Sequence, residues 1–124
     1  MKSLRPYERL RSPAEFQRIF KSGARSDGSL FLMIAAAGRG GASRLGLAVQ
    51  RRVAHAAGRN RAKRFLRESF RRNKPPAGTP LDIVLLPKRE LLTATAAEVE
   101  REFCSRLQLV VSRLSRAAAA ARRH

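Results

Sequence analysis

The sequence has few of the residues from which metal sites and thiol enzymes are built. It contains one cysteine, Cys104, and two histidines, His55 and His124. A single cysteine excludes an internal disulfide, and so few sulfur and imidazole ligands argue against a zinc site. We therefore predict no metal ligand and no cysteine nucleophile in this chain.

Acidic residues are also scarce, with nine Asp and Glu against 27 Lys and Arg, which gives a formal net charge of +18 over 124 residues. Asp27, Asp82, Glu90 and Glu98 fall in different predicted elements, so no carboxylate cluster of the kind a self-contained nuclease needs is apparent. Such an excess of positive charge is usually neutralised by phosphates, either of nucleic acid or of anionic lipid.

Long hydrophobic stretches are missing as well. No segment approaches the roughly 18 consecutive apolar residues of a membrane helix, and charged residues up to Lys21 interrupt any signal-peptide pattern. We therefore favour nucleic acid over lipid, predict no membrane partner and expect a cytoplasmic protein. Arginine makes up 22 of the 27 cations, and its planar donor group matches phosphate oxygens.

The length and the 44% apolar share suit one domain over residues 1–124 with a single core. Within it, residues 1–11 are predicted to be a basic arm or a loosely docked strand, and residues 116–124 a flexible tail. Helical spacing of apolar residues predicts three helices, at 13–21, about 56–73 and from about 96 to 115.

Two of these helices begin with capping-box patterns, Ser12 to Glu15 and Thr95 to Glu98. Apolar runs bounded by glycine and proline predict strands at 30–37 and 81–86, the second central in the sheet. Residues 44–49 look like the hairpin partner of the first run. A short edge strand is also expected within residues 22–29.

The strongest local signal is a cluster of ten cations with a single acid, Glu68. These cations are Arg51, Arg52, Arg59, Arg61, Lys63, Arg64, Arg67, Arg71, Arg72 and Lys74. Like charges three and four residues apart destabilise an isolated helix, so an external polyanion is the expected compensation. A solvated helix face is the alternative, but such faces usually mix both signs of charge.

The residues of this helix resemble a known signature. Residues 59–68, Arg-Asn-Arg-Ala-Lys-Arg-Phe-Leu-Arg-Glu, are similar to the signature of the bacterial ribonuclease P protein component. Residues 16–23 resemble the first helix of that family, and residues 45–53 its strand and basic loop; together the likeness covers roughly 12–115. It implies an α/β (α+β) sandwich with a mixed sheet of about four strands, three helices and a left-handed crossover through the basic helix.

The resemblance also implies a function. Family members assist a catalytic RNA that removes the 5′ leader of precursor tRNA, so the protein alone should be inactive and Mg²⁺ should be held mainly by the RNA. No organic cofactor and no obligate protein partner are expected. The residues that would contact the catalytic RNA are Arg51, Arg52, Arg59, Asn60, Arg61, Lys63, Arg64 and Arg67. Phe16, Phe20 and Phe31 would line a cleft for the single-stranded leader, because aromatic rings stack on any base.

A ribosomal or general RNA-binding protein without a role in processing is the main alternative, and a DNA-binding nucleoid protein is a third. Net charge does not separate them. The ordered match of three segments favours the ribonuclease P reading, since the phenylalanine helix, the Leu45-Gly46-Leu47 strand and the Arg-Asn-Arg helix occur together.

Overall fold

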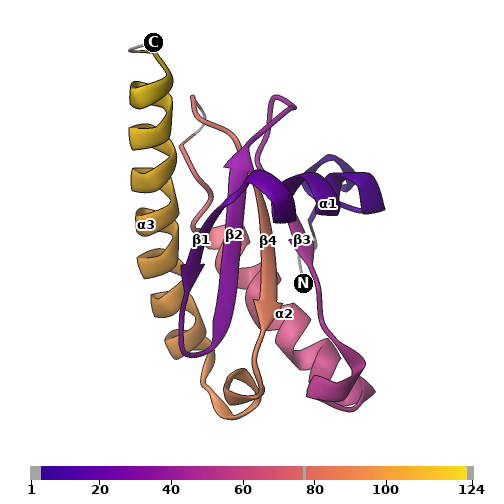
Figure 1. Ribbon diagram of the computed structural model, residues 1–124. Coiled ribbons are helices and arrows are strands. Elements are labelled where there is room, and N and C mark those ends of the chain that lie inside the picture. Colours follow the sequence, from indigo (N-terminus) through magenta and orange to yellow (C-terminus); the bar gives the residue numbers. More distant parts are fainter. Residues whose placement is uncertain (1–3, 77, 123–124) are drawn as a thin grey trace.

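A computed structural model describes residues 4–76 and 78–122 (Figure 1). The strands are Ala24–Asp27 (β1), Phe31–Ala37 (β2), Arg44–Leu47 (β3) and Leu81–Pro87 (β4). The helices are Pro13–Ser22 (α1), Ala56–Arg72 (α2) and Ala96–Arg122 (α3), with short 3-10 helices at Pro6–Glu8 (η1), Arg51–Val53 (η2) and Arg89–Thr93 (η3). The predicted three helices and four-stranded mixed sheet are confirmed.

The sheet has the strand order β1-β2-β4-β3. β2 pairs antiparallel with both β1 and β4, whereas β3 runs parallel to β4. The prediction of a central strand at 81–86 is confirmed, but that of a hairpin between 30–37 and 44–49 is wrong. β4 lies between these two segments, because it is apolar on both faces and is best buried in the middle of the sheet.

Side chains along β2 point alternately to the two faces of the sheet, so the strand contributes to a core on each face. Phe31, Met33 and Ala35 face α2 and α3, while Ile34 and Ala36 face α1. Figure 1 shows α1 in front of the sheet, α2 behind it and α3 beside the β1 edge, and α3 shares the core of the α2 face. The sheet is therefore packed by helices on both sides, and within residues 4–76 and 78–122 α1 is the only α-helix on its side.

The crossover from β3 through α2 to β4 is left-handed. In Figure 1 both strands run down the page, β3 lies to the right of β4, and α2 returns behind the sheet. Parallel connections are right-handed in nearly all folds, so this feature, expected only from the family resemblance, could not be derived from the residue pattern.

Of the two predicted capping boxes, the one at α3 forms and the one at α1 does not. At α3 the Glu98 carboxylate accepts from the Thr95 amide at 2.8 Å, and the Thr95 hydroxyl accepts from the Glu98 amide at 3.1 Å. At α1 the prediction is wrong, because Ser12 makes no side-chain cap and Glu15 pairs with Arg18.

The described residues near the two chain ends belong to a packed N-terminal segment and to α3. Leu4 and Leu10 are buried, and the Leu10 amide donates to the Leu45 carbonyl at 2.9 Å, so the described part of the predicted arm packs along the β3 edge. α3 continues to Arg122, so residues 116–122 are helical. The flexibility of 116–124 stays a prediction, and residues 1–3 and 123–124 lie outside the described part.

Candidate RNA-binding surface

Helix α2 has one buried face and one charged face. Ala62, Leu66, Ser69 and Phe70 are buried and pack toward the sheet and α3. Phe65 lies half-buried at the edge of this face. The signature cations and Asn60 therefore lie on the remainder of the helix, where phosphates can reach them.

The cations of this region fall into two groups. Arg71 and Arg72 pair with Glu68, and Lys74 pairs with Glu8, so the C-terminal end of α2 is neutralised within the protein. In the described part of the chain, no carboxylate lies within 4.0 Å of the cations of the other group. These unpaired cations are Arg51, Arg52, Arg59, Arg61, Lys63, Arg64 and Arg67.

Some unpaired arginines are held by the protein's own backbone. Arg61 donates to the carbonyls of Leu92 at 2.5 Å and Ala94 at 3.2 Å, and its guanidinium lies 4.5 Å from the centre of the Phe65 ring. Arg64 approaches the same ring at 5.5 Å but makes no hydrogen bond with a described residue. Arg61 therefore fixes α2 to η3 as well as contributing charge, whereas Arg64 is exposed.

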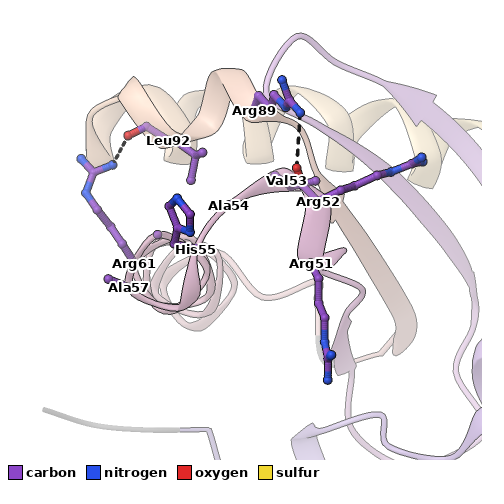
Figure 2. A pocket seen from close by; sticks show the side chains of 10 residues that line it. Arg51, Arg52, Val53, Ala54, His55, Ala57, Arg61, Arg89 and Leu92 are labelled. Atoms are coloured by element: carbon purple, nitrogen blue, oxygen red, sulfur yellow. Dashed lines mark hydrogen bonds between the residues drawn. The ribbon is translucent and has the colours of Figure 1, made fainter.

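A cavity of about 580 Å³ opens beside the start of α2 (Figure 2). It lies between η2, the first turns of α2 and η3, with His55 and Leu92 on its wall. Figure 2 shows Arg61 reaching to Leu92 on one side and Arg51 and Arg52 extending from η2 on the other. Four arginines line it, Arg51, Arg52, Arg61 and Arg89. The predicted Arg51 and Arg52 thus adjoin the signature helix, and Arg89, which sequence reasoning missed, joins them.

A smaller groove of about 180 Å³ separates the N-terminal segment from α2. Arg9, Arg11, Lys63 and Arg67 line it, and the Arg9 Nε is buried without a hydrogen-bond partner in the described chain. Burial, and secondarily the charge of Arg9, lowers the pKa of Arg67. Arg9 and Arg11 were not assigned from sequence, because residues 1–11 show no periodicity that would reveal what they face.

Gly58 lies inside the first turn of α2, directly before the signature. A Cβ at this position would meet the Ala54 Cβ at 3.0 Å and the Leu92 Cδ2 at 3.5 Å. The glycine therefore allows the helix start to approach the loop before it, whereas the contact with Leu92 would be an ordinary one.

Of the three phenylalanines predicted to line the leader cleft, only Phe16 and Phe20 lie together. Phe16 and Phe20 lie on α1 with ring centroids 6.3 Å apart, both partly exposed at the open side of the sheet, beside the half-buried Leu32 and Leu86. Phe31 is fully buried on the opposite face, so the prediction that it lines this cleft is wrong. Because successive strand residues point to opposite faces, a strand that places Leu32 toward α1 must turn Phe31 away.

In residues 4–76 and 78–122, no three His, Cys, Asp or Glu side chains come together as a metal site. The same residues include no helix long and apolar enough to cross a membrane.

Comparison with known proteins decides between the RNA-binding classes left open by charge alone. The family profile described as Ribonuclease P matches residues 4–111. The chain belongs to the ribonuclease P protein family. Among curated relatives, the ribonuclease P protein component of Thermotoga maritima is 39% identical over 84 residues, covering 68% of this chain and 72% of its own. That of Syntrophobacter fumaroxidans is 39% identical over 99 residues, covering 79% and 83%.

Solved structures of the same family have the same fold. The ribonuclease P protein from Thermotoga maritima superposes with a TM-score of 0.69 at 34% identity, covering 83% of this chain and 94% of that one. The Staphylococcus aureus protein, at 24% identity, gives a TM-score of 0.72 over 82% and 94% of the two chains, which supports the fold alone.

Family membership confirms the predicted function as the protein subunit of ribonuclease P, in tRNA processing. It also implies an RNA partner within the ribonucleoprotein. A ribosomal or general RNA-binding role is not favoured.

Proposed function

We propose that the unpaired cations of η2 and α2 hold the catalytic RNA of ribonuclease P in the cytoplasm. The observation that carries this proposal is the division of charge along α2. Glu68 and Glu8 neutralise the C-terminal cations, whereas Arg59, Lys63 and Arg64 have no acid within 4.0 Å in the described chain. Arginine and lysine left without acidic partners are suited to phosphates, which form charge-assisted hydrogen bonds with them.

The partly exposed rings of Phe16 and Phe20 would receive the single-stranded 5′ leader of precursor tRNA. Stacking on phenylalanine does not depend on base identity, which suits leaders of varied sequence. Arg51 and Arg52, in the loop that leaves β3, supply cations for the catalytic RNA. Substrate and catalytic RNA would thus meet the protein on adjoining surfaces.

The protein would contribute binding and orientation, while bond cleavage would lie with the RNA. The described side chains fit no Mg²⁺ site of their own, because their carboxylates are dispersed or engaged in ion pairs. Mg²⁺ would accordingly be held mainly by RNA phosphates, which are ligands of the kind it prefers.

Reconstitution tests this function. Purified protein is added to the catalytic RNA at a low Mg²⁺ concentration at which the RNA alone is slow, and removal of the leader is followed on a gel. We expect the protein to accelerate leader removal and to show no cleavage without the RNA. Cleavage by the protein alone, or no effect on the RNA, would refute the proposal.

A further inference from the structure

We infer that Asp82 is a positioning residue that sets the orientation of α1 and thereby the place of Phe16 and Phe20 in leader binding. This inference rests on the leader-binding role proposed above. Asp82 itself contacts no RNA in this account, since its side chain is fully buried.

Asp82 lies in the central strand β4, opposite Arg44 of β3 and Ala36 of β2. Its side chain points to the same face of the sheet as Val84, toward α1. The carboxylate accepts two hydrogen bonds from Arg44, at 2.9 Å from Nε and 2.8 Å from Nη2, and another from Arg18 of α1. One buried carboxylate therefore ties the helix to two neighbouring strands.

Glu15 completes this network. It pairs with Arg18 at 2.8 Å and with Arg44 at 3.4 Å, and the exposed Arg39 approaches it at 4.0 Å. The two acids with Arg18 and Arg44 therefore connect α1, β3 and β4. The chain has only nine acidic residues, and two of them are used here. Apolar packing is non-directional, whereas the charge-assisted hydrogen bonds from Arg18 to Asp82 and from Arg44 to Glu15 are directional and hold α1 against β4 and β3.

The network and the aromatic rings occupy opposite flanks of α1. At about 100° per residue, Ile19 points at the sheet, with Glu15 and Arg18 to one side of it and Phe16 and Phe20 to the other. Ile19 is fully buried, which agrees with this arrangement. Removing the ion pair between Arg18 and Asp82 would let the helix rotate about its axis at Ile19, and this rotation would move Phe16 and Phe20.

The aromatic flank packs closely on the sheet, so such a movement would alter its contacts. A Cβ added to Gly46 of β3 would lie 2.6 Å from the Phe16 Cζ, so this ring sits directly over the strand backbone. A Cβ at Gly23, just after α1, would lie 2.6 Å from the Ile19 carbonyl oxygen and 2.7 Å from the Ile34 Cγ2. A small roll of the helix would therefore change the exposure of the two rings and the contact between the Phe16 ring and Gly46.

The test uses full-length protein labelled with 4-fluorophenylalanine, with the Phe16 and Phe20 resonances assigned from Phe16→Leu and Phe20→Leu. Asp82→Asn keeps the side-chain size and removes the charge. We expect these two resonances to shift or broaden. We also expect the preference for RNA with a leader over mature tRNA to fall roughly fivefold, as for one weakened stacking contact. The control is Ile83→Val, a neighbour on β4 that faces the other side of the sheet.

The outcomes separate the inference from the function on which it rests. Unchanged Phe16 and Phe20 resonances in Asp82→Asn would overturn the inference and leave the leader-binding proposal standing. Shifted resonances with an unchanged leader preference would overturn both, because the aromatic flank would then not bind the leader. If Asp82→Asn does not fold, Arg18→Gln provides the same readouts, since it removes the ion pair between α1 and Asp82 but keeps the Arg44–Asp82 pair.

Discussion

At the scale of single residues, Gly46 determines how closely α1 approaches the sheet. We predict that Gly46→Ala displaces the Phe16 ring and lowers the free energy of unfolding by about 1 to 3 kcal/mol, the usual effect of overpacking. Urea unfolding measures the loss. Gly40→Ala is the matched control, because a Cβ there meets nothing within 4 Å. Equal stability of the two variants would contradict the close contact between the Phe16 ring and Gly46.

The aromatic residues of α1 give a second prediction at this scale. Phe16→Ala and Phe20→Ala should each weaken binding of RNA with a leader, by about 1 to 3 kcal/mol for a lost base stack, and leave mature tRNA binding nearly unchanged. Phe31→Leu is the control, because Phe31 is buried on the other face of the sheet and should affect stability alone. An equal loss on both RNAs would indicate damage to the core.

At the scale of elements, α3 is fastened to the turn between β1 and β2 by one carboxylate. Glu102 accepts from the amides of Ser29, Leu30 and Phe31 at 3.2, 2.8 and 3.1 Å and from the Ser29 hydroxyl at 2.9 Å. Because Glu102→Ala leaves these donors without their acceptor, we predict a loss of roughly 1 to 3 kcal/mol in the free energy of unfolding. The exposed Glu90→Ala should have little effect, and a similar loss in both variants would argue against this role.

The elements themselves could largely be predicted from sequence, but their pairing could not. The helices at 13–21 and 56–73 and the central strand at 81–86 follow from apolar spacing and breakers, and the structure has them within about two residues. The glycines at 38–41 suggested a hairpin, because sequence cannot show that a later, more apolar strand inserts between two earlier ones. The left-handed crossover was accessible only through the family resemblance.

The candidate site, too, could be predicted from sequence only in part. The charged face of α2 could be predicted, because it depends on spacing within one helix. Which face of the sheet Phe31 points to depends on the alternation of side chains along the strand. A continuous apolar run such as 30–37 does not reveal that alternation. Arg9 and Arg89 approach α2 through tertiary folding, so no local pattern marked them.

At the scale of the whole molecule, the few acids make stability sensitive to acid. Hydrogen bonds from Arg18, Arg71 and the Thr95 amide lower the pKa values of Glu15, Glu68 and Glu98 below the ordinary 4.5. Because these pKa values are depressed in the folded state, their stabilisation is present above pH 4.5 and is lost as the pH falls through the lower folded values.

We therefore predict constant unfolding free energy from about pH 7 to about pH 5 and a decline below about pH 4.5. Protonation of the nine acids would also leave all 27 cations uncompensated and increase self-repulsion. Urea titrations at a series of pH values measure the trend. Rising stability on acidification would contradict the assigned ion pairs.

The whole molecule carries a formal +18, and the central claim is that its unpaired cations on α2 bind RNA phosphates. The most direct test is the salt dependence of binding to the catalytic RNA. Arg64→Ala should reduce the slope of log K against log salt by about 0.7 to 0.9, as expected for one lost phosphate contact. Arg71→Ala should change it much less, because Glu68 already pairs with Arg71. An unchanged slope for Arg64→Ala, or equal changes for both variants, would contradict the account.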